Sequence, residues 1–387
     1  MRLALPFLSA LALSTIPVAA GAAVTPQALD VHVRQAMAAT GAKGIAVAVI
    51  DGGKVTHVKS WGVRNQAGDP LQTDTVMYGA SLTKTVFAYT VMQLAEEGVI
   101  GLDTSIAEYL AKTLPDYPDE ERYAPWSNLK GDERWRKLTP RILLTHSSGF
   151  ANFAFLEPDG RLRFHFEPGA RYAYSGEGLI LLQFVLERGL GLDLGAEMQR
   201  RVFDRFGMPN TSMVWRPDFA RNLADGWNDK GRSEPHDERS KVRAAGSMDT
   251  TIADFARFAA ALMRGDEISR ASRAEMLRPQ LAITSAAQFP TLQPELPPAQ
   301  RHKGLAAGLG LVTFVGPQGP GFFKGGHNDS TGNMLVCVKR GRRCAVILSN
   351  DVRAEAAFPA IIKLVLGETG LPWTWEYGTA AAVKSRP

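Results

Sequence analysis

Strand-like segments lie near both ends of this 387-residue chain, and helix-like segments fill its middle. Near the start, apolar runs at 44–50 and 54–63 flank Asp51-Gly52-Gly53, a group of residues typical of a tight turn. The pattern predicts a β-hairpin after a short helix over about 26–39. Because a lone hairpin is marginally stable in water, these early strands need partners from elsewhere in the chain.

The late part of the chain supplies those partners. Strand-like runs occupy 308–315, 334–338 and 344–348, and a helix is predicted over about 354–366. We therefore expect early and late strands to share one antiparallel sheet flanked by the terminal helices.

The middle of the chain is mostly helical. Three segments there, LILLQFVLERG, GAEMQRRVFDRFG and TIADFARFAAALMRG, carry apolar residues at helical spacing and end at glycine. The predicted fold class is therefore α/β of the α+β type, in a single domain over 24–377. Its sheet part is expected at about 24–80 and 263–370, with an inserted helical subdomain at about 81–262. A tail is expected at 378–387.

Residues 1–22 have the pattern of a secretory signal peptide. Arg2 precedes an uncharged apolar run that ends in the small residues Ala20-Gly21-Ala22. A retained membrane anchor is the weaker interpretation, because the strongly apolar part is short. The sequence therefore predicts a secreted or periplasmic protein, without stable membrane insertion after cleavage of the signal.

The charge pattern bears on the binding partner. The net charge is +5, but the 44 Lys and Arg residues are spread among 39 Asp and Glu residues instead of forming a basic patch. We expect a small-molecule or short-peptide substrate and no nucleic acid. The sequence does not indicate an oligomeric state.

The pattern Ser-x-x-Lys occurs twice, as SLTK at 81–84 and as SNLK at 127–130. About one copy is expected by chance in a chain of this size. The second copy lies between Pro125 and Gly131 without helical periodicity, so we interpret it as the chance copy. The first copy opens a helix whose residues are apolar around most of its circumference, which predicts a buried helix.

Ser81 and Lys84 are the candidate catalytic pair. Residues three apart share a helix face, which places the Lys84 amine near the Ser81 hydroxyl. Burial disfavours the ammonium form, so Lys84 would be able to take the serine proton. Backbone N–H groups at the helix start would favour an oxyanion formed at Ser81. The structural alternative is a serine that caps the helix and a lysine that extends to solvent.

Other catalytic motifs are missing from the sequence. It contains no G-x-S-x-G, G-x-G-x-x-G, P-loop or H-E-x-x-H pattern. The seven histidines stand far apart, without the spacing of metal ligands. The sequence therefore implies no cofactor and no metal.

Several segments together resemble a known superfamily. They are YGASLTK, LTPRILLTHSSGF, FHFEPGARYAYSGEGLILLQFVLE, FGMPNTS, AAGSMDTTIADFARF and GGHNDSTGN. Their order and spacing over about 27–367 are similar to those of the serine β-lactamase and penicillin-binding-protein superfamily, and above all of its class C-like branch. That branch also holds D,D-peptidases, D-aminopeptidases and family VIII-type esterases. The resemblance implies the β-lactamase/transpeptidase-like fold, with the site between sheet and helical subdomain.

The resemblance also implies roles for individual residues. Ser81 resembles the acylated nucleophile, and Lys84 resembles the motif lysine. Tyr174 resembles the tyrosine of the family's Tyr-x-Asn element, which moves protons between nucleophile, leaving group and water. Because the reference pKa of tyrosine is about 10, Tyr174 would need an ammonium such as that of Lys84 to favour the phenolate. By position, the backbone N–H of Ser330 would join that of Ser81 as the oxyanion hole.

Two positions depart from the family pattern. Gly176 stands where Tyr-x-Asn has asparagine, so no side-chain amide is available there to hold a substrate. His327-Asn328-Asp329 stands where the family has Lys-Thr-Gly or His-x-Gly, which keeps the histidine but not the glycine. His327 and Asn328 are the expected substrate-binding residues, with Gly176 facing the same site. Asp329 would oppose an anionic substrate.

The two cysteines lie in the segment VCVKRGRRCAVIL. With Arg340-Gly341 as a two-residue hairpin turn, Cys337 faces Cys344 on the opposite strand. The sulfurs are then either bridged, as an oxidising compartment allows, or two buried free thiols.

These observations favour a secreted serine hydrolase that cleaves ester or amide bonds through a Ser81 acyl-enzyme. The expected substrates are short-chain carboxylic esters. One alternative is a D,D-peptidase, D-aminopeptidase or β-lactamase that acts on cell-wall peptides or β-lactams. Another is a non-catalytic penicillin-recognising binding or sensor protein on the same fold, motivated by the departures at Gly176 and Asp329.

Overall fold

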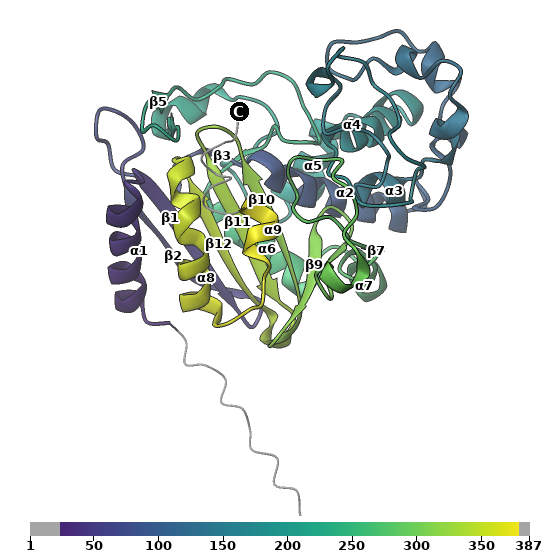
Figure 1. The fold of residues 1–387 in the computed structure, drawn as a ribbon. Helices are drawn as coiled ribbons and strands as arrows, with labels where there is room; N and C mark the ends of the chain where they lie inside the picture. Colours follow the sequence, from purple (N-terminus) through teal and green to yellow (C-terminus); the bar gives the residue numbers. More distant parts are fainter. Residues whose placement is uncertain (1–23, 379–387) are drawn as a thin grey trace, which may run out of the picture.

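A computed structural model describes residues 24–378. The predicted signal peptide at 1–22, and the predicted tail beyond Gly378, lie outside the described residues. The described chain forms a sheet part and a helical part that lie side by side (Figure 1).

The sheet part is built on an eight-stranded antiparallel sheet. Its strands follow the order β2-β1-β12-β11-β10-β9-β8-β7. They span β1 Gly44–Asp51, β2 Lys54–Gly62, β7 Leu281–Ala282, β8 Ala306–Ala307, β9 Val312–Gly316, β10 Gly319–His327, β11 Gly332–Val338 and β12 Arg343–Ser349. Because β1 pairs with both β2 and β12, the sheet joins the two ends of the chain as predicted.

Two further strand pairs connect the loops near the site. They are β3 Met77–Tyr78 with β6 Asp249–Thr250, and β4 Gly226–Trp227 with β5 Ser233–Glu234. The β3–β6 pair fixes the segment immediately before Ser81 to the start of a long helix of the sheet part, α6 Ile252–Arg264.

The other helices divide between the termini and the middle of the chain. They span α1 Pro26–Thr40, α2 Thr83–Glu96, α3 Pro140–Leu144, α4 Gly176–Phe184, α5 Leu194–Met198, α7 Arg270–Met276, α8 Phe358–Leu366 and α9 Trp373–Tyr377. Two of them continue as π-helical turns, at Val185–Gly189 and Gln199–Phe203. The helical segments predicted from sequence periodicity thus correspond to α4, α5 and α6.

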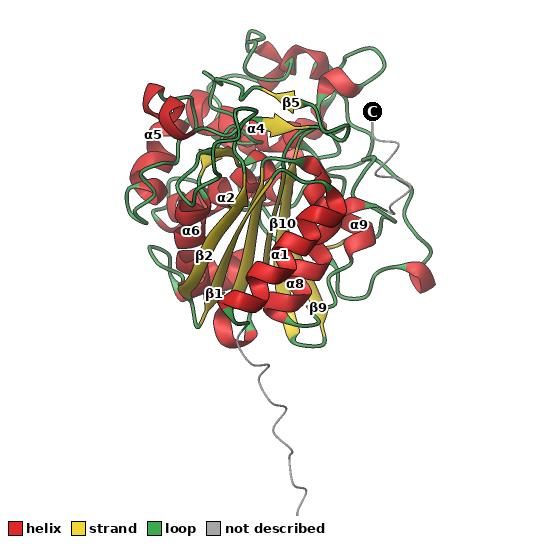
Figure 2. Ribbon diagram, turned by 90° about the vertical axis from the view of Figure 1, so that its left-hand side faces the viewer, coloured by secondary structure: helices red, strands yellow, loops and turns green. Residues whose placement is uncertain are grey.

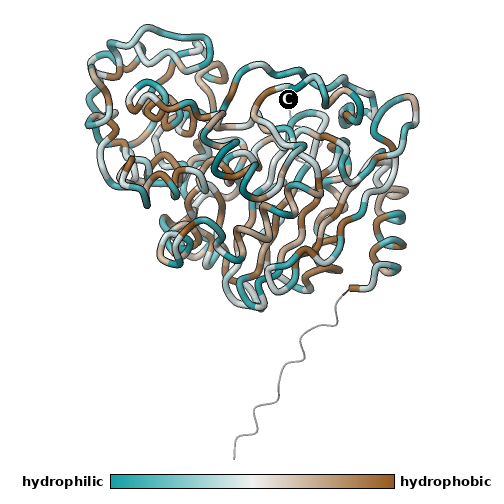
Figure 3. The backbone as a smooth tube through the Cα atoms, turned by 180° about the vertical axis from the view of Figure 1, so that it is seen from behind, coloured by the Kyte–Doolittle hydropathy of each residue, from teal (hydrophilic) through white to brown (hydrophobic). Residues whose placement is uncertain are grey.

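Helices cover both faces of the sheet (Figure 2). On β1, Ile45 and Val47 belong to a core shared with α1, α8 and α9, whereas Ala46 and Ala48 belong to a core shared with α2 and α6. Nearly all residues of β1, β11 and β12 are buried, so these central strands are mostly apolar on both faces, whereas the edge strand β2 is largely exposed. Hydrophobic stretches run through the sheet in Figure 3. The site-bearing edge of the sheet is therefore held by packing on both faces.

Helix α6 belongs to the sheet part. It begins at the cap residue Thr251, whose hydroxyl accepts from Asp254 N at 3.1 Å, and it ends at Gly265 in the left-handed conformation, with φ 81°. The helix packs on β1, β2 and β12. The predicted boundary of the helical subdomain near residue 262 is therefore too late, because α6 covers the sheet.

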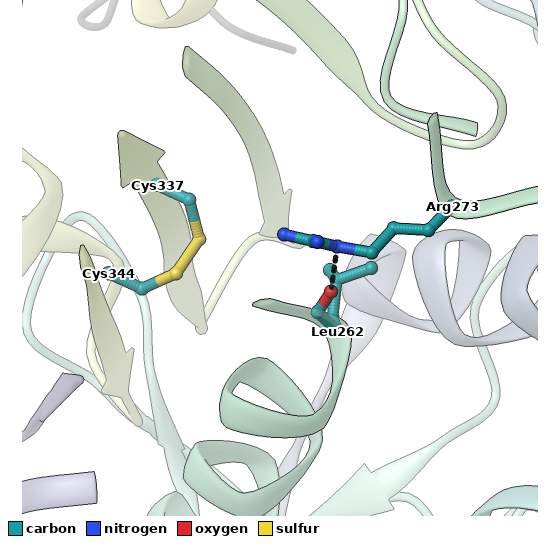
Figure 4. Close-up of a disulfide and its surroundings, with 4 residues drawn as sticks. All are labelled: Leu262, Arg273, Cys337 and Cys344. Atoms are coloured by element: carbon teal, nitrogen blue, oxygen red, sulfur yellow. Dashed lines mark hydrogen bonds between the residues drawn. A yellow bond between two sulfur atoms is a disulfide. The ribbon is translucent and has the colours of Figure 1, made fainter. Parts of the chain in front are cut away.

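The β11–β12 hairpin has the predicted register. Cys337 pairs with Cys344, and the two form a disulfide on the α6 side of the sheet, near Leu262 and Arg273 (Figure 4). Arg273 Nε donates to the Leu262 carbonyl oxygen at 3.1 Å, which ties the segment after α6 to the end of that helix. Both cysteines are fully buried.

Candidate active site

Ser81 lies in a 3₁₀ turn, Ala80–Leu82, immediately before α2. Ala80 adopts the left-handed conformation with φ 47°, which is strained for a residue with a side chain and is typical of functional sites. Every residue of α2 from Thr83 to Leu94 is buried. The serine is therefore presented from the end of a rigid, fully packed helix.

Lys84 and Tyr174 both contact the Ser81 hydroxyl. Lys84 Nζ lies 3.0 Å from Ser81 Oγ, and the Tyr174 hydroxyl donates to the same oxygen at 2.8 Å. Lys84 Nζ also donates to the Ala245 carbonyl oxygen, so the amine is held from a second side. The structure thus brings together the three residues that the sequence selected as the nucleophile and its two proton-transfer partners.

Burial sets the protonation of this group. It lowers the pKa of Lys84 well below its ordinary value, and the nearby charge of Lys324 lowers it further. Burial raises the pKa of Tyr174. A neutral amine beside a neutral phenol follows, so the Lys84 ammonium that a Tyr174 phenolate would require is not favoured.

Aromatic contacts hold Tyr174 in place. The His146 ring stacks on it with a centroid distance of 4.4 Å, and Phe289 meets it edge-on at 5.1 Å. Ser175 caps α4, and its backbone N–H donates to His146 Nδ1 at 3.1 Å. Burial lowers the pKa of His146 well below its ordinary value, so its ring is a neutral support.

A second buried lysine, Lys324, belongs to the site and was not predicted. Its Nζ lies 5.2 Å from the centre of the Tyr174 ring and donates to the Gly325 carbonyl oxygen at 2.6 Å. Burial lowers its pKa to about 8. The signal that sequence analysis missed is Lys324-Gly325-Gly326, a lysine followed by two glycines in what proves to be β10.

Gly326 brings the backbone of β10 against the nucleophile. A Cβ atom at this residue would lie 3.0 Å from the backbone nitrogen of Ser81 and 2.9 Å from that of Leu82. Only glycine allows two backbones to approach so closely. The strand that passes Ser81 is therefore anchored at Gly326, three residues before Asp329, the position that was compared with the family's glycine.

Ser330 lies elsewhere. Its backbone N–H donates to Asn328 Oδ1 at 3.1 Å inside the β10–β11 turn, and its side chain lies against Gly226. The expectation that Ser330 supplies the second oxyanion-hole donor therefore does not fit the structure, because its donor is already used within that turn.

Two of the other residues predicted near the substrate line the cavity, and a third does not. His327 and Asn328 line the cavity beside Ser81, and His327 Nδ1 lies 3.1 Å from Glu355 Oε1. Asp329 is exposed in the turn, away from the cavity lining, so the predicted repulsion of anionic substrates loses its basis.

Gly176 is buried beneath two residues of another loop. A Cβ atom there would lie 2.4 Å from Phe153 Cε1, so the Phe153 ring fills the space that a side chain at 176 would need. Gly176 N donates to Asn152 Oδ1 at 2.9 Å. It is Asn152 and Phe153, and not Gly176, that line the cavity, so the prediction of Gly176 as a substrate contact is wrong.

The cavity at Ser81 has a volume of about 640 Å³. Besides the catalytic candidates, its lining includes three phenylalanines, Phe153, Phe155 and Phe289, and the charged segment 237–243. This size suits a small organic substrate. The described part of the chain holds no group of three or more His, Cys, Asp or Glu side chains placed to bind a metal ion.

The second Ser-x-x-Lys copy has a different environment. Ser127 Oγ donates to Asp119 Oδ2 at 2.6 Å, and Ser127 is exposed. Neither Ser127 nor Lys130 lines the cavity. Its interpretation as a chance copy agrees with this position.

Fold and site together define a class, the serine hydrolases that place a lysine and a tyrosine beside the nucleophile. A family model described as Beta-lactamase matches residues 29–366, and the chain belongs to the β-lactamase family. The resemblance found in the sequence is thereby confirmed.

Curated relatives include hydrolases and a penicillin-binding protein. The chain is 32% identical over 185 residues to lovastatin esterase of Penicillium rubens, across 40% of this chain and 44% of that protein. It is 25% identical over 269 residues to penicillin-binding protein 4* of Bacillus subtilis, across 60% of this chain and 55% of that protein. The chain thus spans about half the length of these relatives.

Solved structures share the fold. The octameric penicillin-binding protein homologue from Pyrococcus abyssi superposes with a TM-score of 0.69 and 20% identity, covering 88% of this chain and 77% of that one. The D-alanine carboxypeptidase AmpC from Burkholderia cenocepacia gives 0.67 and 18%, covering 86% and 97%. The predicted β-lactamase/transpeptidase-like fold is confirmed. No helix within residues 24–378 is both long and apolar enough to cross a membrane.

Proposed function

We propose that this protein is a serine carboxylesterase that works through a Ser81 acyl-enzyme. The observation that carries the proposal is the Ser81 hydroxyl, which lies 3.0 Å from a buried amine and 2.8 Å from a buried phenol inside one cavity. A non-catalytic binding or sensor protein would need neither of these two contacts.

Lys84 is the base in the first step. Its neutral amine takes the Ser81 proton as Oγ attacks the substrate carbonyl, and a tetrahedral oxyanion forms. Tyr174, protonated at neutral pH, donates its hydroxyl proton to the leaving alkoxide and recovers a proton from Lys84. In the second step water attacks the acyl-enzyme, gives up its proton along the same path, and Ser81 is released.

Two backbone N–H groups would stabilise the oxyanion, those of Ser81 and His327. Asn328 N donates to Thr331 O across the β10–β11 turn, so His327 and Gly332 form the next pair, which is not hydrogen-bonded within the ladder. The His327 N–H therefore points away from β11, toward the side of β10 where Gly326 meets Ser81. His327 thus takes the role first expected of Ser330.

An uncharged ester makes smaller demands on this site than an amide. The Phe153 ring occupies the space beside Gly176, so no side chain from α4 is available to hold a substrate amide. Lovastatin esterase among the relatives supports the same class. An alkoxide is also a better leaving group than an amine, so an ester makes smaller demands on the acid.

One observation favours a second candidate, a peptidase that acts on D-amino-acid peptides. The Arg243 guanidinium lines the cavity, and among residues 24–378 it has no hydrogen-bond or ion-pair partner. A free guanidinium binds a carboxylate well, and cell-wall peptides end in one. The similarity to penicillin-binding protein 4* supports this second candidate.

We further propose that the protein acts outside the cytoplasm. The signal-peptide pattern of residues 1–22 and the Cys337–Cys344 disulfide both support a secreted or periplasmic location. Export can be tested directly by fractionating cells that express the full chain.

A fluorophosphonate probe tests the proposed function. The intact protein should gain the mass of one phosphonyl group on Ser81, and Ser81→Ala should gain none while its thermal melt changes little. Ser127→Ala is the matched control and should label like the wild type. Labelling that survives Ser81→Ala, or that is lost in Ser127→Ala, would contradict the assignment.

A further inference from the structure

An exposed aromatic residue lies at the cavity that contains Ser81. Phe155 is 70% exposed, the highest fraction among the large hydrophobic residues that the structure exposes. The others are Val31, Val55, Leu156 and Val315, and none of them lines the Ser81 cavity. Because Phe155 also lines the cavity, its exposed ring is available for contact with an apolar part of a ligand.

Phe155 belongs to a pair of parallel rings. Its ring stacks on that of Phe153 with a centroid distance of 5.1 Å and an angle of 10° between the planes. The Phe153 ring is held in place because its edge packs against Gly176. The two rings therefore form a stacked aromatic pair of which the Phe153 member is held in place.

Asn152 adds a polar group next to these rings. Its side-chain oxygen accepts from Gly176 N at 2.9 Å, and its backbone oxygen accepts from Glu177 N at 2.9 Å. The side chain is thereby oriented, and its Nδ2 amide has no partner among the described residues. This amide lines the same cavity and is available to a substrate oxygen.

We propose that Phe153 and Phe155 bind a flat, unsaturated group of the ester substrate, such as an aryl ring, and that Phe155 sets this preference. The proposal rests on the proposed esterase function and names its substrate class. A planar group can extend this stack by lying flat on an exposed ring face, whereas a puckered group of equal size cannot. Stacked aromatic pairs contribute about 0.5–1.5 kcal/mol beyond buried area, which corresponds to about 2- to 10-fold in kcat/KM.

Matched substrates isolate flatness from size. Benzyl acetate and cyclohexylmethyl acetate differ only in the ring of the alcohol, and methyl phenylacetate and methyl cyclohexylacetate differ only in the ring of the acyl group. The wild type should prefer the aryl member of at least one pair by about fivefold. Phe155→Ala should reduce that ratio to below about twofold. Leu156→Ala changes an exposed neighbour outside the cavity lining and should leave the ratio unchanged.

A ratio near one in the wild type for both pairs, or a ratio that Phe155→Ala leaves intact in a folded protein, overturns the proposal. A binding experiment separates this proposal from the proposed function. Ligand-observed NMR would measure the binding of benzyl acetate and cyclohexylmethyl acetate to the Ser81→Ala variant. If the aryl ester binds more tightly, Phe155→Ala removes this preference, and the wild type hydrolyses no ester, then the aryl subsite stands and the esterase function is refuted. If the wild type hydrolyses esters without any aryl preference, the esterase function stands and the aryl subsite is refuted.

Discussion

Lys84 and Lys324 lie beside the same aromatic ring, with their Nζ atoms 4.9 and 5.2 Å from the centre of Tyr174. Both amines are buried, and the charge of Lys324 lowers the pKa of Lys84. Two lysines with different protonation therefore serve one site. In the proposed mechanism Lys84 is the neutral base, while Lys324, whose pKa is lowered to about 8 by burial, changes its charge near that pH.

The first prediction concerns that charge. Because the pKa of Lys324 is lowered to about 8, its ammonium is present below pH 8 and is lost above it. The ammonium favours the oxyanion and keeps Lys84 neutral, so kcat/KM of the wild type should fall as pH rises through about 8. Lys324→Met should lower kcat/KM at pH 7 by about 100-fold and remove this fall. A wild-type rate that stays flat from pH 7 to 10 would contradict the assignment.

The second prediction is the opposite effect of Lys324 on stability. Its pKa is lower in the folded state than in the unfolded state, so between about pH 8 and 10.5 the unfolded state binds more protons and stability rises with pH. Below pH 8 the burial penalty is fully present. Lys324→Met should therefore raise the free energy of unfolding at pH 7 by about 1–3 kcal/mol, and by less at pH 10. Urea unfolding at the two pH values measures the difference.

The third prediction concerns the contact between β10 and the nucleophile. A methyl group at Gly326 would meet the backbone atoms of Gly79, Ser81 and Leu82 at 2.9–3.0 Å, so Gly326→Ala must push the strand away from the nucleophile. We expect kcat/KM to fall by at least about 100-fold. Gly178→Ala in α4 is the control, because the added Cβ atom would lie 3.3 Å from its nearest neighbour, the side-chain oxygen of Ser148. This variant should retain activity.

Strand β10 is the part of the site that the sequence did not predict. A sheet shared by early and late strands, the helical middle and the closeness of Ser81 and Lys84 were all predicted from the sequence, and the structure agrees with them. Strand β10 was not predicted, because Gly319, Pro320 and three further glycines hide its pattern. With that strand missed, Lys324 was missed too, and the oxyanion hole was sought at Ser330.

The departure at residue 176 could not be interpreted from the sequence for a different reason. Its meaning depends on Phe153, which lies 23 positions earlier and fills the space above Gly176 in the folded chain. No local pattern reports such a contact between a loop and a helix start. The sequence showed that residue 176 departs from the family pattern, but not that Phe153 fills the space there.

The fourth prediction concerns the disulfide. Protein prepared under oxidising conditions and then denatured should contain no free thiols, and two after reduction, since Cys337 and Cys344 are bridged. The closed loop is short, so replacing both cysteines with alanine should lower the free energy of unfolding by about 2 kcal/mol and leave esterase activity intact. Two free thiols in the unreduced protein would contradict the bridge.

The last prediction concerns esters and β-lactams. A β-lactam places an amide side chain beside the nucleophile, and the space where residue 176 could contact it is filled by the Phe153 ring. An uncharged ester needs no such contact, and its alkoxide leaves more readily than an amine. We expect kcat/KM for p-nitrophenyl butyrate to exceed that for a chromogenic cephalosporin by at least about 100-fold, a difference in transition-state stabilisation on the order of 2.7 kcal/mol. Phe153→Ala opens the space beside Gly176 and should narrow this ratio, whereas Leu156→Ala should not. Comparable rates for the two substrates in the wild type would show that the Phe153 ring does not set the preference.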